Sequence, residues 1–278
     1  MSTLPKISVV TVTYNAERSL EATILSVINQ TYPNIEYIII DGKSKDGTVD
    51  IIKKYTEHIN YWVSEPDKGI YDAMNKGIGK ATGEWINFMN AGDSFVNERV
   101  LTDVFNIHYK QETGCIFGDS IIYKKNKICK QNINPFWLQT RKIKSKGICH
   151  QACFIKTKLA KQFQYDITYK IAADFKLLLD IRNNNHLFYY FPIPICLFDT
   201  TGISSNPYLC FKDDIRLAGL PLNLYTKIIY IHRSLRKPIR QLIQEICLKL
   251  FYLGIKWPYN KIKKNHLILN TQINKGYV

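Results

Sequence analysis

SEPDKGIYDAMNKGIGKATGEWINFMNAGD, residues 64–93, is the most informative stretch of this 278-residue chain for its fold. It predicts a loop, a helix, a strand and an acidic turn, in that order. The strand, at 84–89, runs apolar into Asn90-Ala91-Gly92-Asp93. Ligands of open α/β sheets bind outside the carboxyl ends of the strands, so Asp93 is either a turn former or a ligand for a cation.

The sequence around this stretch alternates between apolar runs and amphipathic helices. Continuous apolar runs such as ISVVTVT (7–13) suit parallel strands that are covered on both faces. The alternation therefore predicts an α/β fold built on a doubly wound, mainly parallel sheet. The predicted strands are 7–13, 35–40, 59–63 and 84–89, and the predicted helices are 18–30, 46–57 and 70–80.

The pattern loosens after residue 97, and the second half is predicted in less regular pieces. These are a helix at 98–110, a strand at 115–119, a hairpin around 124–127, a strand at 148–155, a helix at 171–182 and two short strands within 187–198. One compact domain is expected over 1–205, with halves at 1–95 and 96–205. A basic helical extension, 206–278, is expected to follow it.

The formal net charge is +15, and most of the excess lies at the end of the chain. Residues 225–278 hold eleven Lys and Arg and one acid, whereas the first 224 residues hold 27 basic and 22 acidic groups. The apolar and basic pattern over 228–257 fits a helix lying on an anionic membrane surface or, equally, a helix packed on the domain with a solvated basic face. No recognition motif accompanies the charge, so nucleic acid is not predicted as a partner.

The sequence also indicates where the protein resides in the cell and which state its cysteines adopt. No signal-peptide pattern and no window of 18 uncharged apolar residues occurs, so the sequence predicts a cytoplasmic protein, with peripheral attachment to the inner membrane as the option that the tail adds. The seven cysteines are odd in number and form no CxxC. Reduced, buried thiols are therefore expected rather than a zinc site.

Three carboxylates, Asp41, Asp67 and Asp93, stand at predicted strand ends or adjoining turns. Each alone is usually a cap or turn residue. Together on one edge of a parallel sheet they suit a metal–diphosphate complex, because Mg²⁺ is typically held by one or two carboxylates plus substrate phosphates. Gly42-Lys43-Ser44 looks like the end of a phosphate-binding loop, but Tyr37 stands where that motif needs a glycine.

Four blocks of sequence resemble family 2 glycosyltransferases with the GT-A fold, over about residues 5–205. SEPDKGIYDAMNKGI is similar to a bacterial subgroup that builds capsule, lipopolysaccharide O-chain or other cell-surface glycans. The resemblance implies an inverting enzyme that moves a sugar from a nucleotide-diphosphate donor, UDP by family habit, to a glycan or lipid-linked acceptor. The blocks are 8–48, 64–93, CHQACF (149–154) and AADF (172–175).

The resemblance also implies roles for individual residues. Asp174 matches the catalytic base, and Asp41 matches the carboxylate that accepts the uracil N–H. Asp93 closes the segment in the place of the DxD-type motif and would bind Mn²⁺ or Mg²⁺. The remaining donor-binding residues implied in this way are Thr13, Tyr14, Asn15, Asp67, Lys68, Asn75, Asn90, Ala91, Gly92 and His150.

Departures from the family pattern keep rival hypotheses open. Gly92 stands where an aspartate is commoner, and Met74 stands where many members have an arginine. These two residues sustain the alternative of a non-catalytic donor-binding or scaffolding subunit. Asp174 alone also fits a carboxylate that stabilises a helix N-terminus, and His150 fits a structural histidine. A nucleotidyltransferase is disfavoured because TYNAERS (13–19) contains no glycine-rich triphosphate loop.

Overall fold

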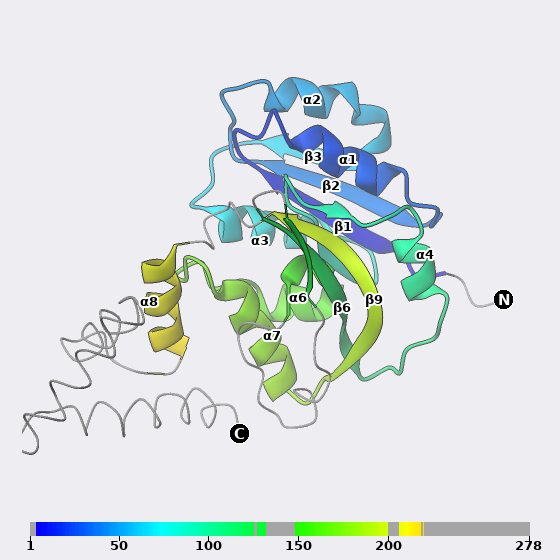
Figure 1. Cartoon of the computed structure of the whole chain (residues 1–278), viewed down its shortest axis with the longest axis vertical. Helices are drawn as coiled ribbons and strands as arrows, with labels where there is room; N and C mark the ends of the chain where they lie inside the picture. The colour runs from blue at the N-terminus through cyan, green and yellow to red at the C-terminus, as the bar shows by residue number, and fades with distance from the viewer. Residues whose placement is uncertain (1–3, 125–126, 132–147, 200–205, 218, 220–278) are drawn as a thin grey trace, which may run out of the picture.

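The computed structural model describes residues 4–124, 127–131, 148–199, 206–217 and 219 (Figure 1). They are built around one nine-stranded sheet in the order β3-β2-β1-β4-β8-β6-β9-β5, with β7 paired to β6. Among these residues, no helix is both long and apolar enough to cross a membrane. The basic segment 225–278, including the helix expected over 228–257, lies outside the described residues.

The first half of the sheet is parallel, as the apolar runs predict. Strand β1 lies between β2 and β4, and β3 is the outer strand. The register pairs Thr13 with Asp41, and Asp41 with Ser64, so the carboxyl ends of β1, β2 and β3 lie level with one another. The strands are β1 Ile7–Thr13, β2 Ile35–Asp41, β3 Tyr61–Ser64 and β4 Trp85–Phe88.

Helices cover both faces of this parallel part (Figure 1). Side chains of β1 alternate between two cores: Val10 and Val12 pack with α3 and the helices of the second half, while Ile7 and Val9 pack with α1, α2 and α4. Gly77 lets α3 approach β1, because a Cβ there would lie 2.5 Å from Val10 Cγ1. The helices of this half are α1 Leu20–Ile28, α2 Thr48–Lys54, the short 3₁₀ turn η1 Thr56–His58 and α3 Ile70–Lys80.

The second half extends the sheet with strands in mixed directions. Strand β8 is antiparallel to both β4 and β6, and β6 is parallel to the long strand β9. The strands are β5 Ser94–Phe95, β6 Thr113–Lys124, β7 Lys127–Gln131, β8 Cys153–Lys156 and β9 Leu187–Asp199. The helices are α4 Val100–Phe105, η2 His150–Ala152, α6 Thr157–Phe163, α7 Ala173–Asn183 and α8 Pro207–Leu217.

The α/β class and the strands of the first half are confirmed, and several details of the second half differ. Strand β5 was not predicted, and the helix predicted at 98–110 is limited to Val100–Phe105. The segment 187–198 forms one strand, because the register slips between Gly118–Phe191 and Asp119–Pro194 and so accommodates Pro192. The strand predicted at 148–155 begins only at Cys153, after the η2 turn. Helix α6 was not predicted at all.

Candidate active site

Segments from distant parts of the sequence meet at the carboxyl edge of β2, β1 and β4. Thr13 and Asp41 are register partners at the ends of β1 and β2. On the other side of β1, the Ala91 N–H donates to the Val12 carbonyl over 3.1 Å, which draws the turn 90–93 alongside the end of β1. Parallel topology alone therefore brings the predicted base-binding segment and the acidic turn to one edge.

Asp41 is fully buried and held by hydrogen bonds. It accepts the Ser64 hydroxyl over 2.6 Å, the Ser44 N–H over 3.0 Å and the Ser44 hydroxyl as well. A carboxylate offers about four acceptor positions, so these bonds fix its orientation and leave capacity for one further donor. The predicted contact of Asp41 with a uracil N–H stays a prediction, and because Asp41 is fully buried it requires the surrounding side chains to move.

Two more predicted residues surround Gly42, directly after Asp41. A Cβ on Gly42 would lie 2.4 Å from Asp67 Oδ2 and 3.3 Å from the Tyr14 ring, so the glycine makes room for both side chains. Tyr14 is 60% exposed, which leaves its ring available to a planar base. Asp67 also accepts the Gly69 N–H over 2.8 Å.

The segment that joins β1 to α1 is fixed to the turn after β2. Asn15 adopts a left-handed backbone with φ of 48°, its N–H donates to Ser44 Oγ over 2.8 Å, and its Oδ1 accepts the Lys45 N–H over 2.9 Å. Thr13 is buried, and its Oγ1 has no hydrogen-bond partner within the described part of the chain. Its hydroxyl therefore lies at the carboxyl end of β1 without a hydrogen bond to the described residues.

The acidic turn 90–93 is shaped by its backbone and by Thr23 of α1. The Thr23 hydroxyl donates to the Asp93 carbonyl over 2.7 Å and accepts the Gly92 N–H over 3.0 Å. Gly92 has φ of +100°, a region that glycine enters freely and side-chain-bearing residues rarely adopt. The departure from the family pattern at 92 thus has a conformational basis in this chain.

Asp93 and Asn90 offer the oxygen atoms of the turn. Asp93 is 6% exposed, and its Oδ2 accepts the Gln151 Nε2–H over 2.7 Å. Asn90 Nδ2 lies 3.1 Å from His150 Nε2, and Asn90 Oδ1 is buried without a partner among the described residues. A buried acceptor with no donor needs an explanation, and ordered water, an ion or a ligand can each supply one.

His150 connects the acidic turn to Asp174. Its Nδ1 lies 3.0 Å from Asp174 Oδ2, while its Nε2 lies against Asn90. Burial by itself disfavours the imidazolium, but the hydrogen bond and the charge of Asp174 outweigh that effect and raise the pKa of His150 above its ordinary value. Asn90, His150 and Asp174 therefore form one continuous polar chain.

Asp174 is the second residue of α7 and is only partly exposed. Its Oδ1 accepts the Phe175 N–H over 2.8 Å, and the Tyr71 hydroxyl lies 3.4 Å from the same oxygen. The stronger contact of Tyr71 is with the Ile171 carbonyl. Burial and, after it, the nearby Asp174 charge raise the pKa of Tyr71, so its hydroxyl stays a protonated donor.

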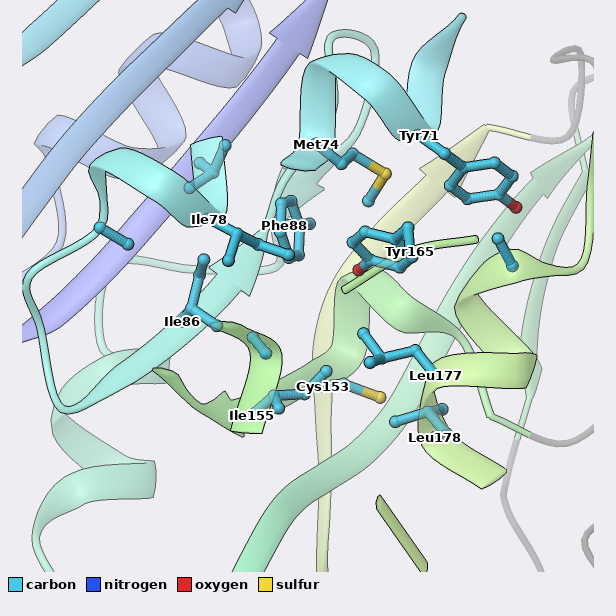
Figure 2. Packing of buried hydrophobic residues seen from close by; sticks show 14 of the residues in the cluster. Tyr71, Met74, Ile78, Ile86, Phe88, Cys153, Ile155, Tyr165, Leu177 and Leu178 are labelled. Carbon is cyan, nitrogen blue, oxygen red and sulfur yellow. The ribbon is translucent and has the colours of Figure 1, made fainter. Parts of the chain in front are cut away.

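Two predicted donor-binding residues stand apart from this chain. Lys68 is exposed, and its N–H donates to Asp72 Oδ2 over 2.9 Å. Asn75 forms two hydrogen bonds of 2.8 Å with the backbone of Tyr165, whose ring stacks on Tyr71 at 5.4 Å (Figure 2). The structure thus gives Asn75 a positioning contact, and its role in donor binding stays a prediction.

Tyr71 and Gln151 are absent from the predicted site residues although both touch its members. Each lies inside a block that carries the family resemblance, Tyr71 in 64–93 and Gln151 in 149–154, which was the available signal. Their partners could not be read from those blocks. Tyr71 meets Ile171 one hundred positions later, and Gln151 meets Asp93 across 58 positions.

The oxygen donors of the turn fit a divalent cation that a substrate helps to hold. The Asp93 carboxylate and the unpartnered Asn90 Oδ1 are hard donors of the kind that Mg²⁺ and Mn²⁺ take. No group of three His, Cys, Asp or Glu suited to a metal gathers anywhere in the described ranges. The donor set therefore fits an ion shared with a diphosphate and does not fit an ion held by protein side chains alone.

Known proteins resemble this chain in sequence and in fold. The model of glycosyl transferase family 2 matches residues 8–160. A PGL/p-HBAD biosynthesis glycosyltransferase of Mycobacterium bovis is 29% identical over 208 residues, which cover 73% of this chain and 80% of the relative.

Two solved structures share the fold. TarS 1–349 of S. aureus in complex with UDP-GlcNAc aligns with a TM-score of 0.61 and 16% identity, covering 82% of this chain and 72% of TarS 1–349. The mannosyltransferase PcManGT of Pyrobaculum calidifontis, in complex with GDP-Man and Mn²⁺, aligns with a TM-score of 0.60 and 16% identity, covering 98% and 86%. These likenesses confirm the GT-A fold that the sequence predicts.

Proposed function

The chain belongs to glycosyl transferase family 2, and from that premise we propose that it is an inverting enzyme of bacterial cell-surface glycan assembly. It would move a sugar from a nucleotide-diphosphate donor, UDP first among the nucleotides, to a glycan or lipid-linked acceptor. The observation that carries the proposal is the polar chain Asn90–His150–Asp174, because it sets a carboxylate base one side chain away from the acidic turn.

The reaction assigned to these residues is a single displacement. The acceptor hydroxyl oxygen attacks the anomeric carbon, its proton passes to the Asp174 carboxylate, and the bond from the anomeric carbon to the diphosphate oxygen breaks. The nucleoside diphosphate leaves with the bonding electrons, and attack from the opposite face inverts the anomeric centre. A positioned base of this kind contributes about 10²–10⁴-fold to the rate.

The donor would lie along the carboxyl edge of β2, β1 and β4. Tyr14 offers a ring face to the base, and Asp41 offers its remaining acceptor position to a base N–H. His150 Nδ1, 3.0 Å from Asp174 Oδ2, keeps the Asp174 carboxylate oriented. Asp93, with Asn90 Oδ1 beside it, would hold Mn²⁺ or Mg²⁺, and such an ion would neutralise charge on the departing diphosphate.

Calorimetric titration with UDP, GDP and dTDP, each with and without Mn²⁺, tests the donor site. We expect metal-dependent binding of one nucleotide. The loss of a charge-assisted contact in Asp93→Ala should weaken that binding by about 10- to 100-fold. Binding to no nucleotide under any condition would reject the donor site.

A turnover assay with donors of the bound nucleotide separates the enzyme from the alternative of a non-catalytic donor-binding subunit. The enzyme hydrolyses or transfers a donor, and Asp174→Asn lowers that activity by about 10²–10⁴-fold. A wild-type protein that binds the nucleotide but turns over no donor would favour the non-catalytic subunit, the alternative that Gly92 and Met74 keep open.

A further inference from the structure

Helix α8 lies outside the segment matched by the family model, yet it contacts the loop that carries the proposed base. We propose that Asp213 of α8 is a positioning residue that fixes the loop 170–172 and, through it, the carboxylate of Asp174. The inference rests on the proposed function, since it assigns Asp213 a part in the same transfer. It also makes α8 a working part of the active site.

Three consecutive backbone N–H groups converge on one oxygen of Asp213. Asp213 Oδ2 accepts the N–H of Lys170 over 2.9 Å, that of Ile171 over 2.7 Å and that of Ala172 over 3.1 Å. Successive N–H groups that turn toward one point form a cradle for an anion. Here the anion is a side chain of the same protein, and it is 4% exposed.

The cradle lies immediately before Asp174 in the chain. Ala172 is the N-cap of α7, and Asp174 is the second residue of its first turn. Ile171 is held from two sides, because its N–H donates to Asp213 and its carbonyl accepts the hydroxyl of Tyr71. The same Tyr71 oxygen lies 3.4 Å from Asp174 Oδ1. Asp213 and Tyr71 therefore fix the start of α7 from opposite sides.

Packing of α8 does not by itself require a carboxylate at this position. Phe211 and Ile215 are buried, and Leu217 packs against Phe175 and Leu179 of α7. A buried charge is costly unless its partners compensate for lost water, and Asp213 forms no ion pair within the described ranges. The buried carboxylate of Asp213 receives its hydrogen bonds from the N–H groups of loop 170–172. We therefore assign it the role of fixing that loop.

The test measures kcat, donor KM and UDP affinity in Asp213→Asn and Asp213→Ala, with Arg216→Ala as matched control. Arg216 lies on the same helix and contacts the same region through Asp166 at 3.6 Å and the Tyr169 ring, but its side chain is 46% exposed. Small displacements of a reacting group lower rates by up to about 10²-fold. We therefore expect kcat to fall about 10- to 100-fold in Asp213→Ala, with UDP affinity unchanged within about twofold.

The asparagine variant keeps one acceptor oxygen and the side-chain shape, so its loss should be smaller, and Arg216→Ala should match the wild type. Amide hydrogen exchange adds a readout that needs no turnover: the amides of 170–172 should exchange faster in Asp213→Ala and not in Arg216→Ala. If Asp213→Ala does not fold, Asp213→Asn carries both measurements.

A double-mutant cycle shows whether Asp213 acts through Asp174. Adding Asp213→Ala to Asp174→Asn should cause no further loss of kcat, because the group being positioned is already inactive. Additive losses would overturn the inference, as would wild-type kcat and unchanged exchange in both Asp213 variants. A wild-type protein with no turnover instead rejects the proposed function, and the exchange measurement then reports on the anchor alone.

Discussion

Buried polar groups at the two ends of the parallel strands differ in whether they have hydrogen-bond partners. At the amino end, Glu36 accepts the Ser8 hydroxyl over 2.5 Å, the Thr82 N–H over 2.7 Å and the Thr82 hydroxyl over 2.5 Å, and it pairs with Lys6 at 3.0 Å. At the carboxyl end of the same strands, Thr13 Oγ1 and Asn90 Oδ1 are buried and have no partner in the described part of the chain.

The difference separates the part of the sheet that stabilises the fold from the part that can bind a ligand. Buried donors and acceptors that are all paired contribute to stability, whereas an unpaired buried oxygen costs about 1–3 kcal/mol unless something outside the chain completes it. Left-handed backbone at Asn15, with φ of 48°, adds strain at the same carboxyl end. Thr157 Oγ1, which follows β8 near Glu84, is an exception at the amino end.

The largest effect is expected from Asp174→Asn at the carboxyl side. Removing the base should lower kcat by about 10²–10⁴-fold, while the hydrogen bond to the Phe175 N–H can persist, so stability and UDP affinity should change little. A turnover assay and a calorimetric UDP titration on one preparation check the predicted changes in kcat and in UDP affinity. Unchanged kcat would remove Asp174 from the catalytic role.

At the amino end, Glu36→Gln should lower the unfolding free energy and leave kcat unchanged. Burial alone would raise the pKa of Glu36, but hydrogen bonds from Ser8, Thr82 and Lys6 outweigh burial and lower it from the ordinary value of 4.5 to about 2. The depressed pKa means that the stabilisation is present above about pH 4.5 and is lost as the pH falls toward 2. The contribution at neutral pH is on the order of 2–3 kcal/mol.

Denaturant unfolding of the wild type and Glu36→Gln at pH 7 and pH 3 checks this prediction. The gap in unfolding free energy should be largest at pH 7 and shrink at pH 3, and kcat per folded molecule at pH 7 should match the wild type. A gap that grows on acidification would show that the sign assigned to Glu36 is wrong.

A smaller catalytic effect is expected from His150→Ala. Asp174 would lose one charge-assisted partner but keep the Phe175 N–H, so kcat should fall by about 10-fold, less than in Asp174→Asn. Steady-state kinetics with fixed donor saturation measure the change. A loss as large as that of Asp174→Asn would instead give His150 a direct part in the chemistry.

Sequence patterns were sufficient for the first half of the fold and for the placement of Asp41 and the turn 90–93 at the carboxyl edge of neighbouring strands. Continuous apolar runs mark buried parallel strands, and parallel strands place their carboxyl ends at one edge. The long strand β9 was predicted as two short strands because Pro192 and Pro194 interrupt a strand pattern. In the structure, register slips between Gly118 and Asp119 and between Asp119 and Ser120 accommodate the two prolines.

The polar contacts of the site could not be predicted in the same way. Asn90 meets His150 across 60 positions, and that meeting depends on β8 running antiparallel to β4. Asp213 has no motif of its own, since its three partners are backbone groups 41 to 43 positions earlier. Such contacts depend on register and helix docking, which single-residue patterns do not encode.

The finest test compares two hydroxyls on the same strand, Ser8 and Thr13 of β1. Ser8→Ala removes a donor to Glu36 and an acceptor for the Gly83 N–H at 2.8 Å, so it should lower the unfolding free energy by about 1–3 kcal/mol and leave UDP affinity unchanged. Thr13→Val keeps the shape and removes an oxygen that has no partner, so stability should stay the same or rise by up to about 1 kcal/mol. UDP affinity should fall a few-fold if that oxygen contacts the donor.

Chemical denaturation and calorimetry on the two variants measure both quantities. A Thr13→Val variant destabilised as much as Ser8→Ala would mean that both ends of the strand are structural, and the contrast between the two ends would no longer hold.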